Sequence, residues 1–222
     1  MKTWEEVREV HQWLPQSSDG WHQHSNGGGW IQNTATVHGA ALVCGSALVY
    51  GSALVYGSAQ VCGSAQVRGS AQVCGSARVC GSALVYGSAQ VYDTARVYGS
   101  AQVCDTAQVY GSAQVYDTAR VYGSAQVYDT ARVCGSTLVY GSAQVAKTPI
   151  NVTGLRYDVL ICDKLLTIGC QQHEPAKWRR FTPDQIKKMD TDAATFWRRH
   201  RDALLVMCKH HQAKPRKATK KK

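Results

Sequence analysis

The stretch GSAQVYDTARVYGSAQVY, residues 111–128, repeats a unit of six residues three times. The same unit extends through most of the chain, because an aliphatic residue stands at Ile31, at Val37 and at every sixth position as far as Val145. Around each Val, inward-facing and outward-facing residues alternate, which is the two-residue period of a β-strand. Gly-Ser or Asp-Thr follows as a corner, since Gly and Asp accept the backbone geometry of tight turns.

Units of four strand residues and two corner residues cannot form hairpins, because every corner would then have to reverse the chain. They can form a coil whose turns stack in parallel, with three units per turn and small Ala and Val side chains filling a narrow interior. Residues 18 apart in the sequence then stack at the strand spacing of about 4.8 Å. The sequence therefore predicts a mainly β fold, a triangular solenoid of about seven turns.

The repeat resembles that of the left-handed parallel β-helix in bacterial hexapeptide-repeat proteins, where a small residue follows the aliphatic one four places later. The resemblance covers residues 31–146 and implies a left-handed coil. Tyr or Cys directly after the Val departs from the family pattern, which usually has Gly, Ala or an acidic residue there. With SNGGGWI, LTIGCQQH and ATFWRRHRDALL, the chain also resembles uncharacterised phage and enterobacterial hexapeptide-repeat proteins, labelled transferases from the solenoid alone.

Changes of composition divide the chain into an N-terminal helical cap with a Gly-rich stretch (1–29), the solenoid (30–149), a small α+β module (150–212) and a basic flexible tail (213–222). In the cap, TWEEVREVHQWLP opens with a capping box of Thr3 and Glu6 and has apolar residues at helical spacing. We expect this helix to cover Leu42, Leu48 and Leu54, which point outward from the first turn.

The module should contain short strands, a helix capped by Thr182, and a longer helix from about Thr191 to His211 with Asp190 as its cap.

Sorting the outward residues by the 18-residue turn gives three faces of the coil. The glutamine face stacks Gln72, Gln90, Gln108, Gln126 and Gln144 beside Tyr56, Cys74, Tyr92, Tyr110 and Tyr128. The arginine face carries Arg78, Arg96 and Arg132 beside Cys44, Cys62, Cys80, Tyr98, Tyr116 and Cys134. The leucine face carries Leu48, Leu84 and Leu138 with Tyr50, Tyr86, Tyr122 and Tyr140.

Each face has its own interpretation. Stacked amides and aromatic rings stabilise parallel strands, so the glutamine face has a structural explanation. The arginine face is a candidate anion site with Tyr98 and Tyr116 as stacking platforms, or else a solvated row paired with the corner residue Asp117. The leucine face is the candidate contact between copies in a homo-oligomer, by analogy a trimer, because exposed apolar patches mark contacts. Its contact residues would be Leu48, Leu84, Tyr86, Tyr122 and Leu138.

The net charge of +10 lies entirely after residue 149, since residues 1–149 carry 8 basic and 8 acidic residues and residues 150–222 carry 17 and 7. We expect this basic end to bind an anionic partner: nucleic acid, a nucleotide or an acidic host protein. The alternative is a solubilising surface. The candidate contacts are Lys177, Trp178, Arg179, Arg180, Arg198, Arg199, Arg201 and Lys209.

Six of the nine Cys residues occupy a repeat position that Tyr fills elsewhere, so we expect reduced thiols and a cytoplasmic protein, inside the bacterial host if it is phage-encoded. No apolar run is long enough to span a membrane, and no signal peptide precedes the repeats.

Two pairs, Cys170 with His173 and Cys208 with His211, have metal-ligand spacing and together would complete a tetrahedral zinc site. The alternative is that both Cys side chains are buried and both His side chains are exposed.

Acyltransferases of the hexapeptide-repeat family typically use a His as general base, with acyl-CoA bound between subunits. Residues 31–146 hold one His, His38, which is the only candidate base for such a reaction. The three-His zinc site of the γ carbonic anhydrases, which share the fold, is excluded by that same count. A non-catalytic binding protein is therefore the preferred interpretation, with an acyltransferase or a purely structural scaffold as alternatives.

Overall fold

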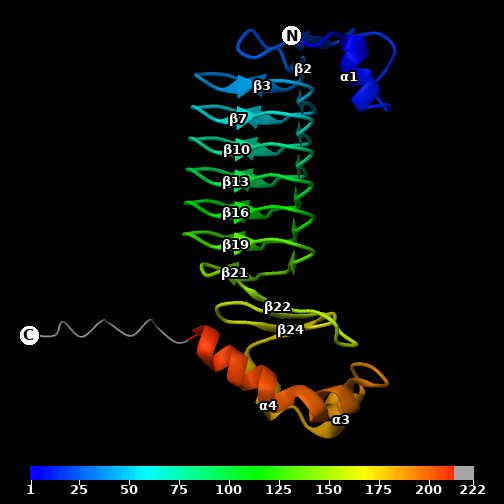
Figure 1. Cartoon of the computed structure of the whole chain (residues 1–222), viewed down its shortest axis with the longest axis vertical. Helices are drawn as coiled ribbons and strands as arrows, with labels where there is room; N and C mark the ends of the chain where they lie inside the picture. Colours follow the sequence, from blue (N-terminus) through cyan, green and yellow to red (C-terminus); the bar gives the residue numbers. More distant parts are fainter. Residues whose placement is uncertain (213–222) are drawn as a thin grey trace, which may run out of the picture. The chain divides into compact units, whose positions relative to one another are not determined.

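The computed structural model describes residues 1–212 and divides the chain into two compact units, Met1–Thr148 and the residues that follow from Pro149 (Figure 1). The tail predicted for residues 213–222 lies outside the described residues. Among those described, no helix combines the length and the apolar character that a membrane crossing needs.

The first unit is a parallel coil whose strands form three sheets, one for each predicted face. The leucine face consists of β2 (Trp30–Gln32), β5 (Leu48–Val49), β8 (Gln66–Val67), β11 (Leu84–Val85), β14 (Gln102–Val103), β17 (Arg120–Val121) and β20 (Leu138–Val139). The arginine face consists of β4 (Leu42–Val43), β7 (Gln60–Val61), β10 (Arg78–Val79), β13 (Arg96–Val97), β16 (Gln114–Val115) and β19 (Arg132–Val133). The glutamine face consists of β3 (Thr36–Val37), β6 (Leu54–Val55), β9 (Gln72–Val73), β12 (Gln90–Val91), β15 (Gln108–Val109), β18 (Gln126–Val127) and β21 (Gln144–Val145).

The strands β2 to β21 make six complete turns and part of a seventh, which confirms the β-solenoid (Figure 1). The predicted register is also confirmed, because Val73 pairs with Val55 on one side and with Val91 on the other. The left-handed sense implied by the resemblance stays a prediction.

The interior of the coil is filled by the two small residues of each unit. Every repeat Val from Val43 to Val145 has no exposed surface, and nearly every repeat Ala is equally buried. Burying a Val side chain stabilises the folded chain by about 1.5–3 kcal/mol, so the spacing of six makes each unit contribute to one continuous core.

The Asp-Thr corners hold adjacent turns together through side-chain hydrogen bonds. Asp105 has φ of 59°, in the left-handed region where most corners of the coil have Gly. Its carboxylate accepts a hydrogen bond from the N–H of Gly123 at 2.9 Å, and the hydroxyl of Thr106 donates to the Gly123 carbonyl at 3.0 Å. The same carboxylate bond joins Asp93 to Gly111 and Asp117 to Gly135. In the columns that these corners form, Asp lies next to Gly.

Side-chain ladders continue this vertical bonding on the outside of the coil. On the glutamine face, the amide of Gln108 donates to Gln90 at 3.1 Å, and the amide of Gln126 donates to Gln108 at 3.2 Å. Beside them, the rings of Tyr92 and Tyr110 stack with centroids 4.9 Å apart. This face is therefore occupied by its own structural contacts, as predicted.

An N-terminal cap packs on the start of the coil. It consists of α1 (Trp4–Val10), which has the predicted capping box, and β1 (Trp21–Gln23), which pairs antiparallel with β2. The buried side chains of Trp4, Val7 and Leu14 pack against Leu48.

Leu48 was predicted to contact another copy of the chain, and this is wrong because the cap already covers it completely. Leu42 and Leu54 stay half-buried, so the cap covers one of the three leucines that it was expected to hide.

One disulfide corrects the expectation that all thiols are reduced. Cys44 is bonded to Cys62 on the next turn, with their Cα atoms 4.7 Å apart. That separation is the strand spacing, and it lies within the range of about 4.4–6.8 Å that disulfides span. Stacking in register thus brings two thiols into bonding distance without any change of the backbone.

The second unit is a small α+β module. Its antiparallel sheet consists of β22 (Ile150–Val152), β23 (Val159–Ile161), β24 (Leu166–Ile168) and β25 (Gln171–His173), and its helices are α2 (Pro175–Arg180), α3 (Pro183–Lys187) and α4 (Ala193–Gln212). Thr182 and Gln185 form the predicted capping box of α3. Apolar side chains of the sheet and of all three helices meet in one core that includes Leu166, Trp178 and Trp197.

Candidate anion-binding surface

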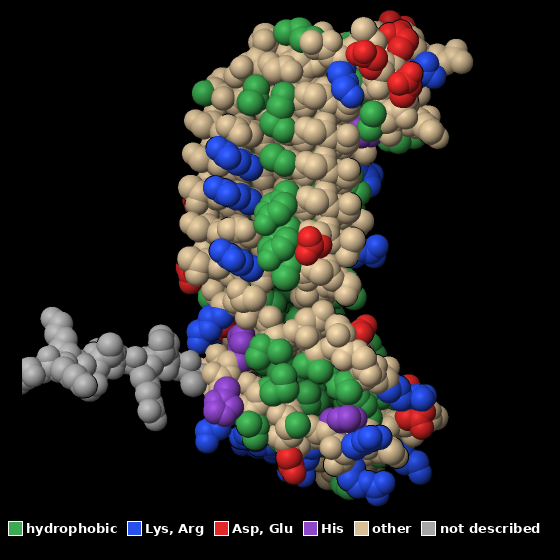
Figure 2. Space-filling model, in the orientation of Figure 1, with side chains coloured by type: hydrophobic (Ala, Val, Ile, Leu, Met, Phe, Trp, Pro, Cys, Tyr) green, Lys and Arg blue, Asp and Glu red, His purple; other side chains and the backbone are tan. Residues whose placement is uncertain are grey.

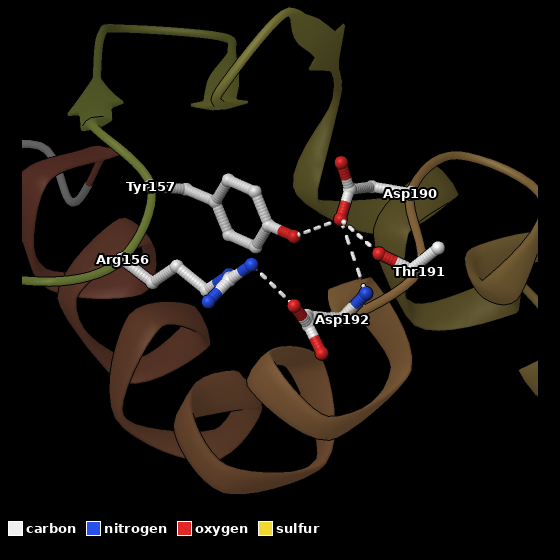
Figure 3. A network of polar contacts seen from close by, with 5 residues as sticks. All are labelled: Arg156, Tyr157, Asp190, Thr191 and Asp192. Carbon is white, nitrogen blue, oxygen red and sulfur yellow. Dashed lines mark hydrogen bonds and ion pairs between the residues drawn. The ribbon is translucent and has the colours of Figure 1, made fainter.

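The start of α4 is fixed to the loop between β22 and β23 by a network of polar contacts (Figure 3). Arg156 forms an ion pair with Asp192, and the hydroxyl of Tyr157 donates a hydrogen bond to the Asp190 carboxylate. Asp190 also accepts from the backbone N–H of Asp192 at 3.0 Å. These hydrogen bonds stabilise its charged form and lower the pKa of Asp190. Asp190 was predicted as the cap of a helix from Thr191, but the helix begins at Ala193, so Asp190 lies two residues before the N-cap position and fixes the preceding turn instead.

The long helix that this network orients has a buried side and several exposed basic side chains. Phe196, Trp197, Leu204, Leu205 and Cys208 face the core. Four basic side chains are exposed: Arg198, Arg199, Arg201 and Lys209. Arg198 and Lys209 are eleven residues apart, about three helical turns or 16 Å, and therefore lie on the same side of the helix.

Helix α2 adds three exposed basic side chains, Lys177, Arg179 and Arg180, but not the aromatic platform predicted between them. Trp178 is 3% exposed, and its indole N–H donates a hydrogen bond of 2.7 Å to the Leu166 carbonyl. A ring that is packed in the core and hydrogen-bonded there cannot stack on a nucleic-acid base. The assignment of Trp178 to a binding surface is therefore wrong.

The seven exposed basic residues of α2 and α4 have no ion-pair partner among the described residues. Arg198 and Arg201 line one shallow depression, together with Phe181 and Asp202. Arg179 and Lys209 line another. Figure 2 shows Lys and Arg side chains spread over the visible surface of this unit.

An apolar cavity in the same unit is lined by side chains that include Tyr157, Cys170, Ile186 and Phe196. Its volume is about 70 Å³. Pockets that bind drug-sized ligands have about 300 Å³ or more, so this cavity is too small for a nucleotide.

The four residues of the predicted zinc site are not brought together. No group of three or more His, Cys, Asp or Glu side chains among residues 1–212 is placed to hold a metal ion. Cys208 is buried in the core, which raises the pKa of its thiol to about 11, whereas Cys170 is exposed in the turn before β25. His173 packs its ring against Trp178 and Phe181. His211 is half-buried at the end of α4.

The arginine face has the predicted stacking but not the predicted ion pair. Arg78 and Arg96 are register partners on adjacent strands, Arg132 lies two strands beyond Arg96, and all three side chains are exposed. Figure 2 shows basic side chains in a column beside a column of apolar ones on the coil. Asp117, the proposed partner, instead accepts the hydrogen bond from Gly135.

On the leucine face, the guanidinium of Arg68 lies 4.7 Å from the centre of the Tyr86 ring, and Tyr122 stacks on Tyr140. Leu84 is half-buried, and Leu138 is 38% exposed. With Leu48 covered by the N-terminal cap, these residues form the partly apolar surface of the leucine face.

His38, the candidate base for acyl transfer, is exposed and has its ring 6.4 Å from the ring of Tyr56. Among the described residues, no carboxylate makes a hydrogen bond or ion pair with the His38 side chain, which such a base would use for orientation.

Sequence reasoning missed two features of the first unit: the disulfide and the hydrogen bonds of the Asp corners. The 18-residue spacing of Cys44 and Cys62 was the available signal for the first.

Comparison with known proteins identifies the repeat and goes no further. The family model described as YdcK beta solenoid repeat matches residues 89–105 and 113–129, within the coil. No curated protein and no solved structure matches the chain. The chain is thus similar to this repeat family over part of its solenoid, which agrees with the fold and bears on no ligand or reaction.

Proposed function

We propose that this chain is a non-catalytic binding protein whose C-terminal unit binds a polyanion, most simply the phosphate backbone of a nucleic acid. The observation that carries the proposal is the set of seven exposed, unpaired basic side chains on α2 and α4. Basic side chains that are not neutralised within the protein are available to phosphates. The sequence resemblance suggests one setting, a phage-encoded protein that inhibits a host factor in the cytoplasm.

The spacing of these charges favours a polymer over a mononucleotide. Arg198 and Lys209 are separated by about 16 Å along α4, which exceeds the size of a single phosphate group. Phosphates follow one another along each strand of a duplex at about 3.4 Å of helix rise, so several can be contacted at once. With Trp178 buried, the predicted stacking ring is absent from this surface, and the Phe181 ring beside Arg198 and Arg201 is half-buried. We therefore expect binding that depends on charge and not on base sequence.

The test is fluorescence anisotropy of the full chain with labelled single-stranded and duplex oligonucleotides between about 50 and 200 mM salt. We expect the affinity to fall steeply with salt. The double variant Arg198→Glu/Arg199→Glu should weaken binding at least tenfold and reduce the slope of log affinity against log salt by about two.

The matched control is Arg78→Glu/Arg96→Glu, which changes the net charge equally but lies on the coil. It should leave nucleic-acid binding nearly unchanged. Equal loss in both variants would mean that net charge alone attracts the nucleic acid, and the proposed surface would be wrong. Absence of binding even at low salt would replace nucleic acid by an acidic protein as the partner.

A further inference from the structure

Three cysteines form a vertical column on the arginine face. Cys44, Cys62 and Cys80 occupy the same position of three successive turns. Each directly follows the Val of β4, β7 or β10, and these three Val residues pair in register. The backbone repeats identically along the column: the N–H of Cys44 donates to Val61, and that of Cys62 donates to Val79, both at 2.9 Å. Cys62 therefore has a cysteine one strand spacing away on each side.

No other repeat cysteine has a cysteine on an adjacent turn. Cys74, Cys104 and Cys134 each lie beside a Tyr, which are Tyr56, Tyr86 and Tyr116 respectively. The column itself is closed at both ends, because Cys44 forms a β-bridge with Gly28 and the turn after Cys80 carries Tyr98. The column thus has three sulfurs and, with one disulfide formed, one free thiol.

We infer that Cys44, Cys62 and Cys80 form a thiol–disulfide exchange site in which one disulfide moves along the coil between two adjacent pairs. The thiolate of Cys80 attacks Sγ of Cys62, an S–S bond forms between them, and the bond to Cys44 breaks. Cys44 leaves as a thiolate and takes up the proton that Cys80 released. One disulfide and one thiol are present before and after, so the step consumes no oxidant.

The geometry of the coil suits this step. Exchange proceeds through three sulfurs in a row, with the attacking thiolate opposite the leaving one. Parallel stacking in register places the three residues in that order, with the leaving Cys44 and the attacking Cys80 on opposite sides of Cys62. Cys44 and Cys80 are two strand spacings apart, about 9.5 Å, which is beyond the roughly 7 Å that a disulfide spans. Every exchange must therefore pass through Cys62.

The surroundings of Cys80 set how readily it reacts. Arg78 and Arg96 favour its thiolate, but partial burial opposes ionisation more strongly and raises the pKa of Cys80 above its ordinary value. The other groups facing it are Cys62 and Tyr98, the residues at the same position of the two adjacent turns. A fully reduced column would gain its disulfide from a small disulfide such as oxidised glutathione: two protein thiols yield one protein disulfide and two glutathione thiols.

Tryptic peptides distinguish the two positions of the disulfide. No Lys or Arg lies between Arg8 and Arg68, so Cys44 and Cys62 are in one peptide, whereas Cys80 is in the peptide of residues 79–96. A Cys44–Cys62 bond is a loop within one peptide, and a Cys62–Cys80 bond joins two. The full chain would be oxidised with oxidised glutathione, incubated with iodoacetamide and digested, and the peptides would be identified by mass spectrometry.

In the parent protein we expect Cys44 to become alkylated over time as the joined pair of peptides increases, at a rate independent of protein concentration. Cys44→Ser should form only the joined pair of peptides. Cys80→Ser should form only the loop within one peptide, and its Cys44 should stay protected from alkylation. Cys62→Ser should form neither disulfide. The control Cys74→Ser should behave as the parent. If Cys44 is alkylated no faster in the parent than in Cys80→Ser, or if Cys44→Ser forms no joined pair, the inference is wrong.

Discussion

The imidazole of His11 donates a hydrogen bond from Nε2 to the carbonyl oxygen of Ser46 at 2.7 Å, between the N-terminal cap and the coil. A carbonyl can only accept, so Nε2 carries the proton. Nδ1 then accepts from the amide of Gln66 at 3.2 Å, while the Gln66 carbonyl accepts from Tyr50 at 2.9 Å. His11 is therefore held as the neutral tautomer, with both ring nitrogens used.

We predict that acid loosens the cap. Burial lowers the pKa of His11 below its ordinary value of 6.5, so below pH 6.5 the unfolded cap binds a proton that the folded cap does not. The stability of the docked cap is thus complete above that pH and falls as the pH drops toward the lower, folded-state pKa. Hydrogen exchange of residues 4–14 measured between pH 7 and pH 5 checks this. His11→Gln cannot titrate, so in this variant the opening of residues 4–14 should not increase as the pH falls. If the parent and the variant show the same pH dependence of exchange, the assignment to His11 is wrong.

The Asp corners should contribute to stability through both their backbone angle and their carboxylate. Asp105→Ala loses the hydrogen bond to Gly123 and places Ala in the left-handed region, so we expect a loss of about 2–3 kcal/mol in the free energy of unfolding. Asp105→Asn keeps an acceptor oxygen and tolerates the angle, so it should lose less than about 1 kcal/mol. Urea unfolding of the three proteins measures the difference. Equal losses for Ala and Asn would assign the effect to the charge of Asp105.

We expect the chain to self-associate through the leucine face. The double variant Leu84→Lys/Leu138→Lys would place charge in an apolar contact. This should weaken the association free energy by several kcal/mol and dissociate the oligomer. Light scattering gives the mass. Leu42→Lys/Leu54→Lys, which carries the same change on the other two faces, should keep the parent mass, and a parent mass for Leu84→Lys/Leu138→Lys would exclude this face.

Alkaline pH should destabilise the C-terminal unit. Burial raises the pKa of Cys162 to about 12 and that of Cys208 to about 11, whereas a thiol in the unfolded chain ionises near pH 8.5. Between these values the folded unit binds more protons than the unfolded one, so stability decreases as the pH rises. The decrease from pH 8 to pH 11, followed by denaturant unfolding, should be smaller in Cys162→Ala/Cys208→Ala than in the parent, even though that variant starts less stable. Parallel curves would contradict the burial of these thiols.

The coil could be predicted because its determinant is local. The interval of six between Val residues specifies strand, corner and turn together, and Val73 lies where the interval placed it. The bond from Asp105 to Gly123 could not be predicted, since it depends on the left-handed angle of one residue and the height of the next turn. Leu48 shows a different limit, because a pattern tells which side chains point outward but not what covers them.

The candidate site was predicted in its charges and not in its aromatic group. Exposure of Lys and Arg follows from composition, since unpaired charges are seldom buried. The inward direction of Trp178 depends on how α2 packs on the sheet, where Trp178 and Pro175 share the buried side of the helix. The zinc prediction rested on spacing within each pair, which carries no information on the distance between the pairs.

The Asp corners also restrict how this protein can change its length. Between Asp93 and Asp129, Asp and Gly alternate at successive corners, so the sequence repeats every 12 residues while the coil repeats every 18. The mismatch makes Asp and Gly alternate in each column. Losing one turn here would stack two carboxylates about 4.8 Å apart, a like-charge contact. Deletions or duplications of 36 residues restore the alternation. Among the all-Gly corners from Gly39 to Gly87, single turns can be gained or lost freely, so the two halves of the coil should vary in length by different steps.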